Sequence, residues 1–536
     1  MNQRACYTNL YEYLRALEEH GQLVRVTRPT DKDTELHPLV RLQYLGLPEE
    51  QRKAFLFENV VDSRGRRYNI PVAVACVAGS RAIYALGLRC RPEEISQRWA
   101  QAYARPIPPL VADKGAVQEV VVEGEALRQE GLGLLPVPIS TPGFDNAPYT
   151  SASQWVTKDP ETGVFNMGVY RGQLKASTRL GCHVTTPGHG LRLHWLRSRE
   201  LGIREMPAAV VIGSPPHLTY TAVASVPVGV SEYDISGGLA QEPVEVVRCR
   251  TVDLLVPAEA EIVIEGTIPT DALEMEGAFG EFPGYMARRG PAFFLEVTCI
   301  THRRNPIYEA MLSQMPPSES SKIRQVAREG IVRRVIEQEL GLGGRLRGVY
   351  FPESAGSLGI CIVSLKKEKP EEPTQILEAL HRRRVVSKMA VIVDEDIDPS
   401  NPDAVFWALA FRMQPHRDAR TAPGLATMLD PSIVPPWDEK DSMVSEKLEG
   451  AASVLLVDAT RKWPYPPLSL PRREFMERAL VLWKELGLPE LRLKEPWFGY
   501  PLGYWTEEEA GEAELAVQGR YYETGEKFKK TGRKPV

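Results

Sequence analysis

Two glutamates five residues apart, Glu276 and Glu281, have a setting suited to acid–base chemistry. They lie in 274–285, E-M-E-G-A-F-G-E-F-P-G-Y, where glycine and proline disfavour a helix and predict a tight, irregular loop. Bringing two carboxylates together in a closed pocket raises the pKa of at least one, which can then hand over a proton near neutral pH. The alternative is a solvated acidic turn, which is the commoner structure for two glutamates at this spacing.

Arg171 is a candidate partner for a substrate acid, because a planar guanidinium can donate two parallel hydrogen bonds to one carboxylate. It stands five residues after Asn166 in F-N-M-G-V-Y-R. Strand alternation places these two side chains on opposite faces unless a bulge near Gly168 re-aims one of them. The alternative is a surface arginine paired with a neighbouring strand.

His189 and Glu232, together with Asn166, would form a mixed oxygen and nitrogen ligand set, which suits manganese or magnesium better than thiolate-seeking metals. His189 lies in a glycine-flanked loop entering a predicted helix, a place where backbone N–H groups can face a phosphate. Glu232 follows Ser231 at the start of another predicted helix. A turn histidine and a capping acid are the alternatives.

No common catalytic motif accompanies these residues, since HExxH, a P-loop, G-x-G-x-x-G and G-x-S-x-G are all absent. The commoner motif-defined enzyme classes are therefore excluded. One acidic run follows a predicted strand: Asp394, Glu395, Asp396 and Asp398. We expect it to form a solvated turn that caps the next helix rather than a cation site.

Composition is that of a soluble globular protein, with 43% hydrophobic and 25% charged residues. A net charge of −5 argues against nucleic-acid binding. The seven cysteines are scattered and form no CxxC pair, which predicts reduced thiols, a cytoplasmic location and no usual zinc site. Neither a signal pattern nor a run of about 18 apolar residues occurs, so we expect no export and no membrane insertion.

The elements that must position these residues fall into several domains, because 536 residues are too many for one core. Helix and strand patterns over 1–110 predict a small α/β domain. Over 111–315, short β-rich segments punctuated by glycine and proline predict a barrel or sandwich with a few helices, among them Leu191 to Leu201 and Glu232 to Leu239.

A connecting helix is expected in 316–342, and strands and helices then alternate over 343–465, which is typical of an α/β layer. The extension 466–536 has one clear helix, R-E-F-M-E-R-A-L-V-L-W-K-E-L-G. We expect this extension to wrap a neighbouring surface and its last ten residues to be frayed.

Taken together, these segments resemble the UbiD family of decarboxylases, which use a prenylated flavin mononucleotide. The family's arginine and two acids resemble Arg171, Glu276 and Glu281, the last inside E-G-x-F-G-E-x-x-G-Y. The ligands that join a divalent metal to the cofactor phosphate correspond to Asn166, His189 and Glu232. All six have the expected type and chain order. Lys388, ahead of V-D-E-D-I-D, resembles a family lysine that contacts the cofactor phosphate.

The resemblance implies an α/β (α+β) fold of three domains: a small N-terminal α/β domain, a central split β-barrel of the flavin-reductase type, and a C-terminal α/β domain. It implies prenylated FMN, Mn2+ or Mg2+, and K+ as cofactors, a flavin prenyltransferase as the supplier of the prenylated FMN, and a homo-oligomer, dimer or hexamer. Val169, Tyr170 and Gly188 would also contact the cofactor. Phe282 and Gly188 would flank the substrate pocket.

The activity implied is reversible non-oxidative decarboxylation of an aromatic or α,β-unsaturated acid. Arg171 would bind the carboxylate, the flavin would add covalently to the carbon bearing it and act as electron sink, Glu281 would protonate that carbon and Glu276 would hold Arg171. Two alternatives stay open: a flavin oxidoreductase on a split barrel, and a non-enzymatic flavin- or metal-binding scaffold.

Overall fold

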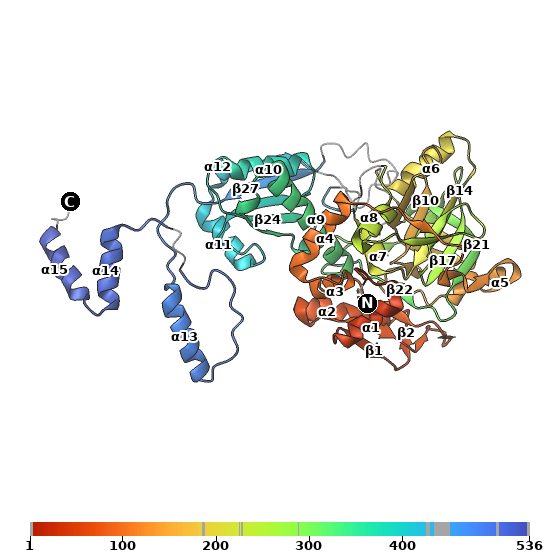
Figure 1. Cartoon of the computed structure of the whole chain (residues 1–536), viewed down its shortest axis with the longest axis horizontal. Helices are drawn as coiled ribbons and strands as arrows, with labels where there is room; N and C mark the ends of the chain where they lie inside the picture. Colours follow the sequence, from red (N-terminus) through yellow and green to blue (C-terminus); the bar gives the residue numbers. More distant parts are fainter. Residues whose placement is uncertain are drawn as a thin grey trace.

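The computed structural model describes residues 4–184, 188–224, 226, 229–287, 289–424, 429–433, 451–499 and 503–532. It has the mixed α/β fold that the sequence predicts, with an N-terminal part, a central sheet domain and a C-terminal α/β domain, followed by a helical tail (Figure 1). Each of the three parts is built round a principal sheet of its own.

The N-terminal part is a four-stranded sheet with helices packed on it, in the strand order β1-β3-β6-β22. Apolar residues at helical spacing bury one face of α1, and the Asn9 side chain caps this helix by accepting from the N–H of Glu12 at 2.9 Å. The elements from this region are α1 (Leu10–Glu19), β1 (Leu23–Val26), β2 (Thr30–Asp31), α2 (Leu36–Gly46), β3 (Ala54–Phe57), β4 (Val60–Val61), β5 (Arg67–Tyr68), β6 (Val72–Val74), α3 (Arg81–Gly87) and α4 (Ile95–Ala104).

The fourth strand of that sheet, β22 (Tyr308–Ala310), comes from the far end of the central region. It pairs in parallel with β6, and every residue of both strands is buried. The N-terminal sheet is therefore complete only when a segment from beyond residue 300 joins it.

The central domain is a ten-stranded, antiparallel sheet with the path β11-β10-β14-β17-β21-β13-β12-β9, to which β8 and β18 add by pairing with β21. Runs such as Ile262–Pro269 are buried on both faces, which suits a sheet that curves round its own core. The elements are β7 (Leu110–Val111), β8 (Val120–Val122), α5 (Gly124–Gln129), β9 (Tyr149–Thr150), β10 (Gln154–Lys158), β11 (Phe165–Val169), β12 (Gly172–Ala176), β13 (Arg179–Cys182), α6 (Gly190–Glu200), β14 (Glu205–Ile212), α7 (Pro216–Val223), α8 (Glu232–Ala240), β15 (Glu245–Arg248), β16 (Leu255–Pro257), β17 (Ile262–Pro269), β18 (Glu274–Glu276), β19 (Phe279–Gly280), β20 (Met286–Ala287) and β21 (Gly290–His302).

The C-terminal domain follows the helix α9 (Glu319–Arg334), which continues as a π-helical turn, η5 (Val335–Glu339). Its five-stranded sheet has the order β23-β24-β25-β27-β26, with the three inner strands parallel. The alternating elements predicted from the sequence are present, and β26 and β27 add to them. The elements are β23 (Leu346–Tyr350), β24 (Ile360–Leu365), α10 (Glu372–Arg382), β25 (Met389–Asp394), α11 (Pro402–Arg412), α12 (Pro415–Asp418), β26 (Ala419–Pro423) and β27 (Ser453–Ala459).

The tail carries α13 (Arg473–Glu485), the helix that the sequence predicts, and then α14 (Glu507–Val517) and α15 (Tyr521–Thr531). None of the three has a buried residue, and the tail extends away from the three domains (Figure 1). The expectation of a frayed end is wrong as far as Thr531. Lys527 of α15 pairs with Glu508 and Glu512 of α14, which holds the two helices together.

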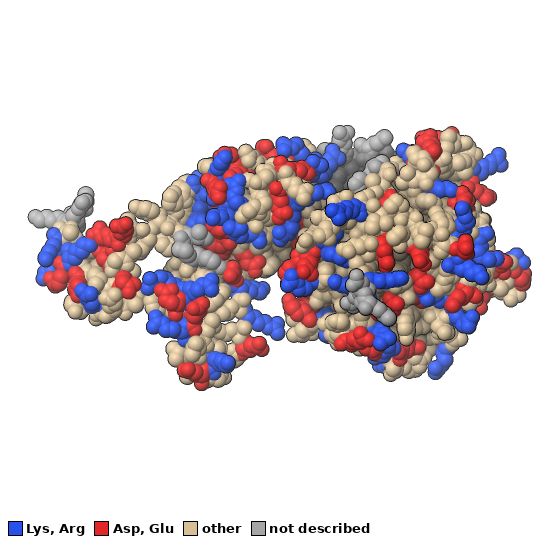
Figure 2. Space-filling model, viewed as in Figure 1, with Lys and Arg blue, Asp and Glu red and all other residues tan. Residues whose placement is uncertain are grey.

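All seven cysteines are free, as predicted. Acidic and basic side chains are interspersed over the face shown in Figure 2. Among the described residues, no helix combines the length and the apolar character needed to cross a bilayer.

Candidate active site

The two glutamates of 274–285 lie on short strands and a turn rather than on a helix. Glu276 ends β18, and Glu281 stands in the turn between β19 and β20, which pair as a hairpin. The turn is closed by the Glu281 N–H, which donates to the carbonyl of Tyr285 at 2.8 Å. The prediction that this stretch is not helical is confirmed, although part of the expected loop is a small hairpin.

Arg171 lies between the two acids. Its Nε and Nη2 donate to the two oxygens of Glu276 at 3.0 and 2.7 Å, and its Nη1 donates to Glu281 Oε1. The exposed fractions of the side chains are 7% for Arg171, 1% for Glu276 and 16% for Glu281. The three groups that the sequence singles out are therefore in contact, and Glu281 is the one that solvent reaches.

The local backbone explains how Arg171 leaves the sheet. No bulge occurs at Gly168, where the register of β10 and β11 is continuous. Instead β11 ends at Val169, and the Tyr170 carbonyl accepts hydrogen bonds from the side chains of Trp155 at 2.9 Å and Ser153 at 2.7 Å. Because the strand ends before Arg171, the side chain of Arg171 does not have to follow the alternation of strand faces, and no bulge is needed.

Aromatic rings form one wall of the acid cluster. The Phe279 ring centroid lies 5.2 Å from the Arg171 guanidinium carbon and 4.5 Å from the Tyr149 ring. Rings of this kind exclude water and strengthen the charge pairs beside them. Phe282, predicted to flank the substrate pocket, has its ring 4.6 Å from the guanidinium of Arg324 in α9.

His183 is a member of the cluster that the sequence did not reveal. Its Nδ1 lies 3.2 Å from Glu276 Oε2. Burial, assisted by the Arg171 charge, lowers the pKa of His183 to about 3, so the imidazole is neutral. It follows β13 directly, and no motif in the sequence marks it.

The three predicted metal ligands come from three elements that meet. Asn166 is on β11, His189 directly precedes α6 and Glu232 opens α8. A Cβ on Gly190 would lie 1.9 Å from Asn166 Oδ1, so glycine is required for this close approach. The N–H of Met167, next to Asn166, donates to Glu232 Oε2 at 2.8 Å. The chain thus brings these side chains to one place.

Their chemistry fits a divalent cation. Asn166 would ligate through its amide oxygen, beside the imidazole of His189 and the carboxylate of Glu232. Burial raises the pKa of Glu232 to about 7 and lowers that of His189, which favours the neutral imidazole that ligates metals. No group of three His, Cys, Asp or Glu side chains suited to a metal exists in the described ranges, so a site here depends on the Asn166 amide.

Four further residues are predicted to contact the cofactor, namely Val169, Tyr170, Gly188 and Lys388. Val169 ends β11, and the Tyr170 ring lies 5.5 Å from that of His189. Gly188 has open space beside its Cα. Lys388 precedes β25 and pairs with Asp430 at 2.7 Å, and none of its described contacts joins it to the acid cluster.

The acidic run after β25 is not a solvated turn throughout. Asp394 and Asp396 are buried and accept hydrogen bonds from Arg412 at 2.6 to 2.8 Å. Arg412 belongs to α11, and Asp394 Oδ2 also accepts from the Arg461 N–H at 2.9 Å. Asp398 forms a turn with the following residues, where its Oδ1 accepts from the Ser400 N–H at 2.8 Å.

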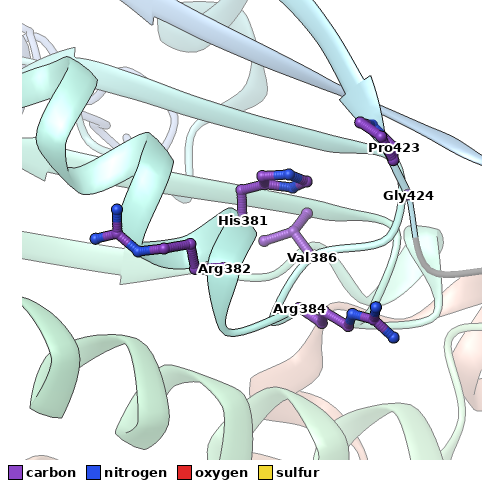
Figure 3. Close-up of a pocket in the computed structure, with 6 residues that line it drawn as sticks. All are labelled: His381, Arg382, Arg384, Val386, Pro423 and Gly424. Carbon is purple, nitrogen blue, oxygen red and sulfur yellow. The ribbon is translucent and has the colours of Figure 1, made fainter.

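A hollow of about 260 Å³ in the C-terminal domain is separate from these clusters. Its lining residues are drawn in Figure 3 and are His381, Arg382, Arg384, Val386, Pro423 and Gly424. Arg384 has a backbone φ of 52°, in the left-handed region, at the end of α10. None of the residues predicted to act in catalysis lines it.

Three models of one family match the chain in order. The 3-octaprenyl-4-hydroxybenzoate carboxy-lyase N-terminal domain matches 14–103, the Rift-related domain 110–316 and the C-terminal domain 332–446. A protein of Archaeoglobus fulgidus is 31% identical over 481 residues, which are 85% of this chain and 92% of its own.

Solved structures also resemble the chain over most of its length. The UbiD-class enzyme HmfF from Pelotomaculum thermopropionicum, in an evolved dimeric form in complex with prFMN, is 29% identical with a TM-score of 0.72, covering 87% of this chain and 96% of its own. The vanillic acid decarboxylase of Sedimentibacter hydroxybenzoicus in closed form is 27% identical with a TM-score of 0.72, covering 90% and 99%.

Proposed function

The chain belongs to the UbiD family of carboxy-lyases, and from that premise we propose that it decarboxylates an aromatic or α,β-unsaturated carboxylic acid reversibly, with prenylated FMN as cofactor. The observation that carries this proposal is the contact of Arg171 with both Glu276 and Glu281. A guanidinium that can exchange one acid partner for a substrate carboxylate, and keep that acid beside it, is suited to binding the substrate and delivering a proton.

Asn166, His189 and Glu232 would hold a divalent metal, Mn2+ or Mg2+, and through it the phosphate of the flavin. Their mixed set of an amide oxygen, an imidazole nitrogen and a carboxylate supports this role. When bound, the prenylated flavin supplies covalent attachment of the substrate and a sink for the electron pair left by carbon dioxide. K+ and Lys388 are further proposed contributors near the phosphate.

Arg171 binds the substrate carboxylate by exchanging one of its partners. Before the substrate binds, Nη1 of Arg171 donates to Glu281, and an incoming carboxylate needs that same N–H. Two anions on one guanidinium edge favour protonation of one of them, so Glu281 takes up a proton as the substrate binds. Substrate binding thereby prepares the proton donor.

Glu281 then transfers its proton to the carbon from which carbon dioxide has left. Glu276, almost fully buried, stays bonded to Arg171 through two oxygens and keeps the guanidinium aligned. In the carboxylation direction the same Glu281 carboxylate removes the proton from that carbon, because both directions share one path. The open space at Gly188 supports a ring-bearing substrate.

The test is production of the chain together with a flavin prenyltransferase, followed by the absorption spectrum and mass of the released cofactor. The purified protein is then incubated with a panel of aromatic and α,β-unsaturated acids, and carbon dioxide release is measured. We expect prenylated FMN and release from at least one ring-bearing acid. Ordinary FMN that a nicotinamide reduces, with no carbon dioxide from any acid, would instead support a flavin oxidoreductase.

A further inference from the structure

A loop that precedes β9 packs against the hairpin that carries Glu281. This loop, 141–146, reads T-P-G-F-D-N. It contributes a third carboxyl group, Asp145, beside the Arg171 cluster. Asp145 is half-buried, and the charge of Arg171 acts on it.

Asp145 is bonded to the backbone of the hairpin itself. Its Oδ1 accepts from the N–H of Gly280 at 3.2 Å, and Gly280 directly precedes Glu281. Its Oδ2 accepts from the N–H of Thr141 at 2.7 Å, which closes the loop on itself. One carboxylate therefore ties the loop to the residue next to the proposed proton donor.

The neighbouring Asn146 holds the other end of the same segment. A Cβ on Gly277 would lie 1.8 Å from Asn146 Nδ2, so the asparagine sits directly on that glycine. Asn146 Oδ1 accepts from Gln173 Nε2 at 3.1 Å, and Gln173 Oε1 accepts from the Gly277 N–H at 3.3 Å. The Tyr149 hydroxyl donates to the Gly277 carbonyl at 3.2 Å. The chain is thus fixed on both sides of Phe279.

We propose that Asp145 is a positioning residue for the reaction, which holds the Gly280 N–H and so places Glu281 against Arg171 and the substrate carbon. This inference rests on the proposed function. Glu276 is fixed independently, by β18 pairing with β21 and by Arg171. Loss of the Asp145 bonds should therefore move Glu281 and leave the carboxylate-binding pair in place.

Both oxygens of the Asp145 carboxylate are used as acceptors. Burial raises the pKa of Asp145 to about 6, although the N–H groups of Thr141, Gly280 and Ser140 and the charge of Arg171 act in the opposite direction. An ionised carboxylate offers two acceptors to two N–H donors, whereas an asparagine offers one. The requirement for both bonds explains why a carboxylate is kept at this cost.

The first test compares Asp145→Ala with Asp145→Asn in the enzyme loaded with cofactor. Asp145→Ala removes both bonds, and we expect kcat to fall about 100-fold with KM within about threefold of wild type. Asp145→Asn keeps one acceptor, so its kcat should lie between the two. Phe144→Ala, in the same loop but 69% exposed, is the matched control and should keep the wild-type kcat. Equal rise of KM in both Asp145 variants at unchanged kcat would overturn the proposal.

The second test does not depend on activity. Hydrogen–deuterium exchange of 277–285 is measured in the same variants without substrate, and we expect exchange at the Gly280 amide to rise about tenfold or more in Asp145→Ala. Unchanged exchange there overturns the proposal even if the wild type is an active decarboxylase. Faster exchange with wild-type kcat overturns it as well. If instead the wild type releases carbon dioxide from no acid, the proposed function fails, while the exchange data still decide whether Asp145 holds the hairpin.

Discussion

Glu281 is the residue on which the proposed chemistry depends most directly. Glu281→Gln keeps the shape and the contact with Arg171 but cannot transfer a proton, and we expect decarboxylation to fall by about 100-fold or more. The measurement is carbon dioxide release together with solvent hydrogen exchange into the product. Glu274→Gln, in the same segment but paired with Lys175 and Arg179, is the control and should remain active. Wild-type turnover in Glu281→Gln would remove Glu281 from the mechanism.

Arg384 offers a separate test at the scale of one residue. Its φ of 52° at the end of α10 is a conformation in which glycine carries no penalty, so Arg384→Gly should stabilise the protein by about 1 kcal/mol. Arg383→Gly is the control. That position has an ordinary φ of −81° and an ion pair with Glu339, so we expect stability to fall. Thermal unfolding of both variants measures the difference.

The acid cluster was predictable from the sequence only in part. Arg171, Glu276 and Glu281 were found because their types and order form a pattern. His183 contacts Glu276 and Asp145 bonds the backbone next to Glu281, but both lie in segments with no pattern of their own. Their positions depend on the pairing of β13 with β21 and on a loop packing against a distant hairpin. Contacts of that kind are set by the tertiary fold and leave no local spacing in the chain.

Three different elements supply the proposed metal ligands, and this arrangement can be tested by removing one. Glu232→Gln keeps the acceptor for the Met167 N–H but removes the negative charge, and we expect the bound divalent metal to be lost. Metal content by mass spectrometry, measured after co-production with the prenyltransferase, gives the result. Asp234→Asn, in the same turn of α8, is the control. A full complement of metal in Glu232→Gln would exclude this residue as a ligand.

At the scale of helices and strands, periodic segments were predicted best. The helix at Glu232 and the alternation from β23 to α11 follow from apolar spacing and caps. The acidic run after β25 was predicted wrongly, because its partner Arg412 comes from the next helix. The end of the tail was also wrong, since α15 is held by ion pairs with α14. Both errors concern charged residues whose partners lie farther along the chain than the few neighbouring residues from which local structure is predicted.

Buried acids in the body of the molecule make its stability depend on pH. Burial raises the pKa of Glu309, on β22, to about 8 and that of Glu319, at the start of α9, to about 7. A carboxyl whose folded pKa lies above its unfolded value favours the protonated folded state. Stability therefore falls as the pH rises from about 4.5 to about 8.

Glu309→Gln removes one of these groups and should reduce that loss. At pH 7 the ionisation penalty of Glu309 amounts to about 3 kcal/mol, and we expect the variant to lose less stability than wild type between pH 5.5 and pH 8. Denaturant unfolding at several pH values measures this. Glu259→Gln, which carries a more exposed acid paired with Arg303, is the control. Parallel pH curves for wild type and Glu309→Gln would contradict the prediction.

The strand β22 has a consequence for the order in which the protein folds on the ribosome. The edge of β6 is fully buried in the finished chain, but its partner is not yet synthesised when the first 110 residues have emerged. Until then an apolar strand edge is free to pair with other chains. We expect a fragment of residues 1–110 to aggregate, as judged by its soluble fraction, and a fragment of 1–316 to be more soluble. The N-terminal sheet, which is synthesised first, therefore stays open at β6 until β22 has been synthesised.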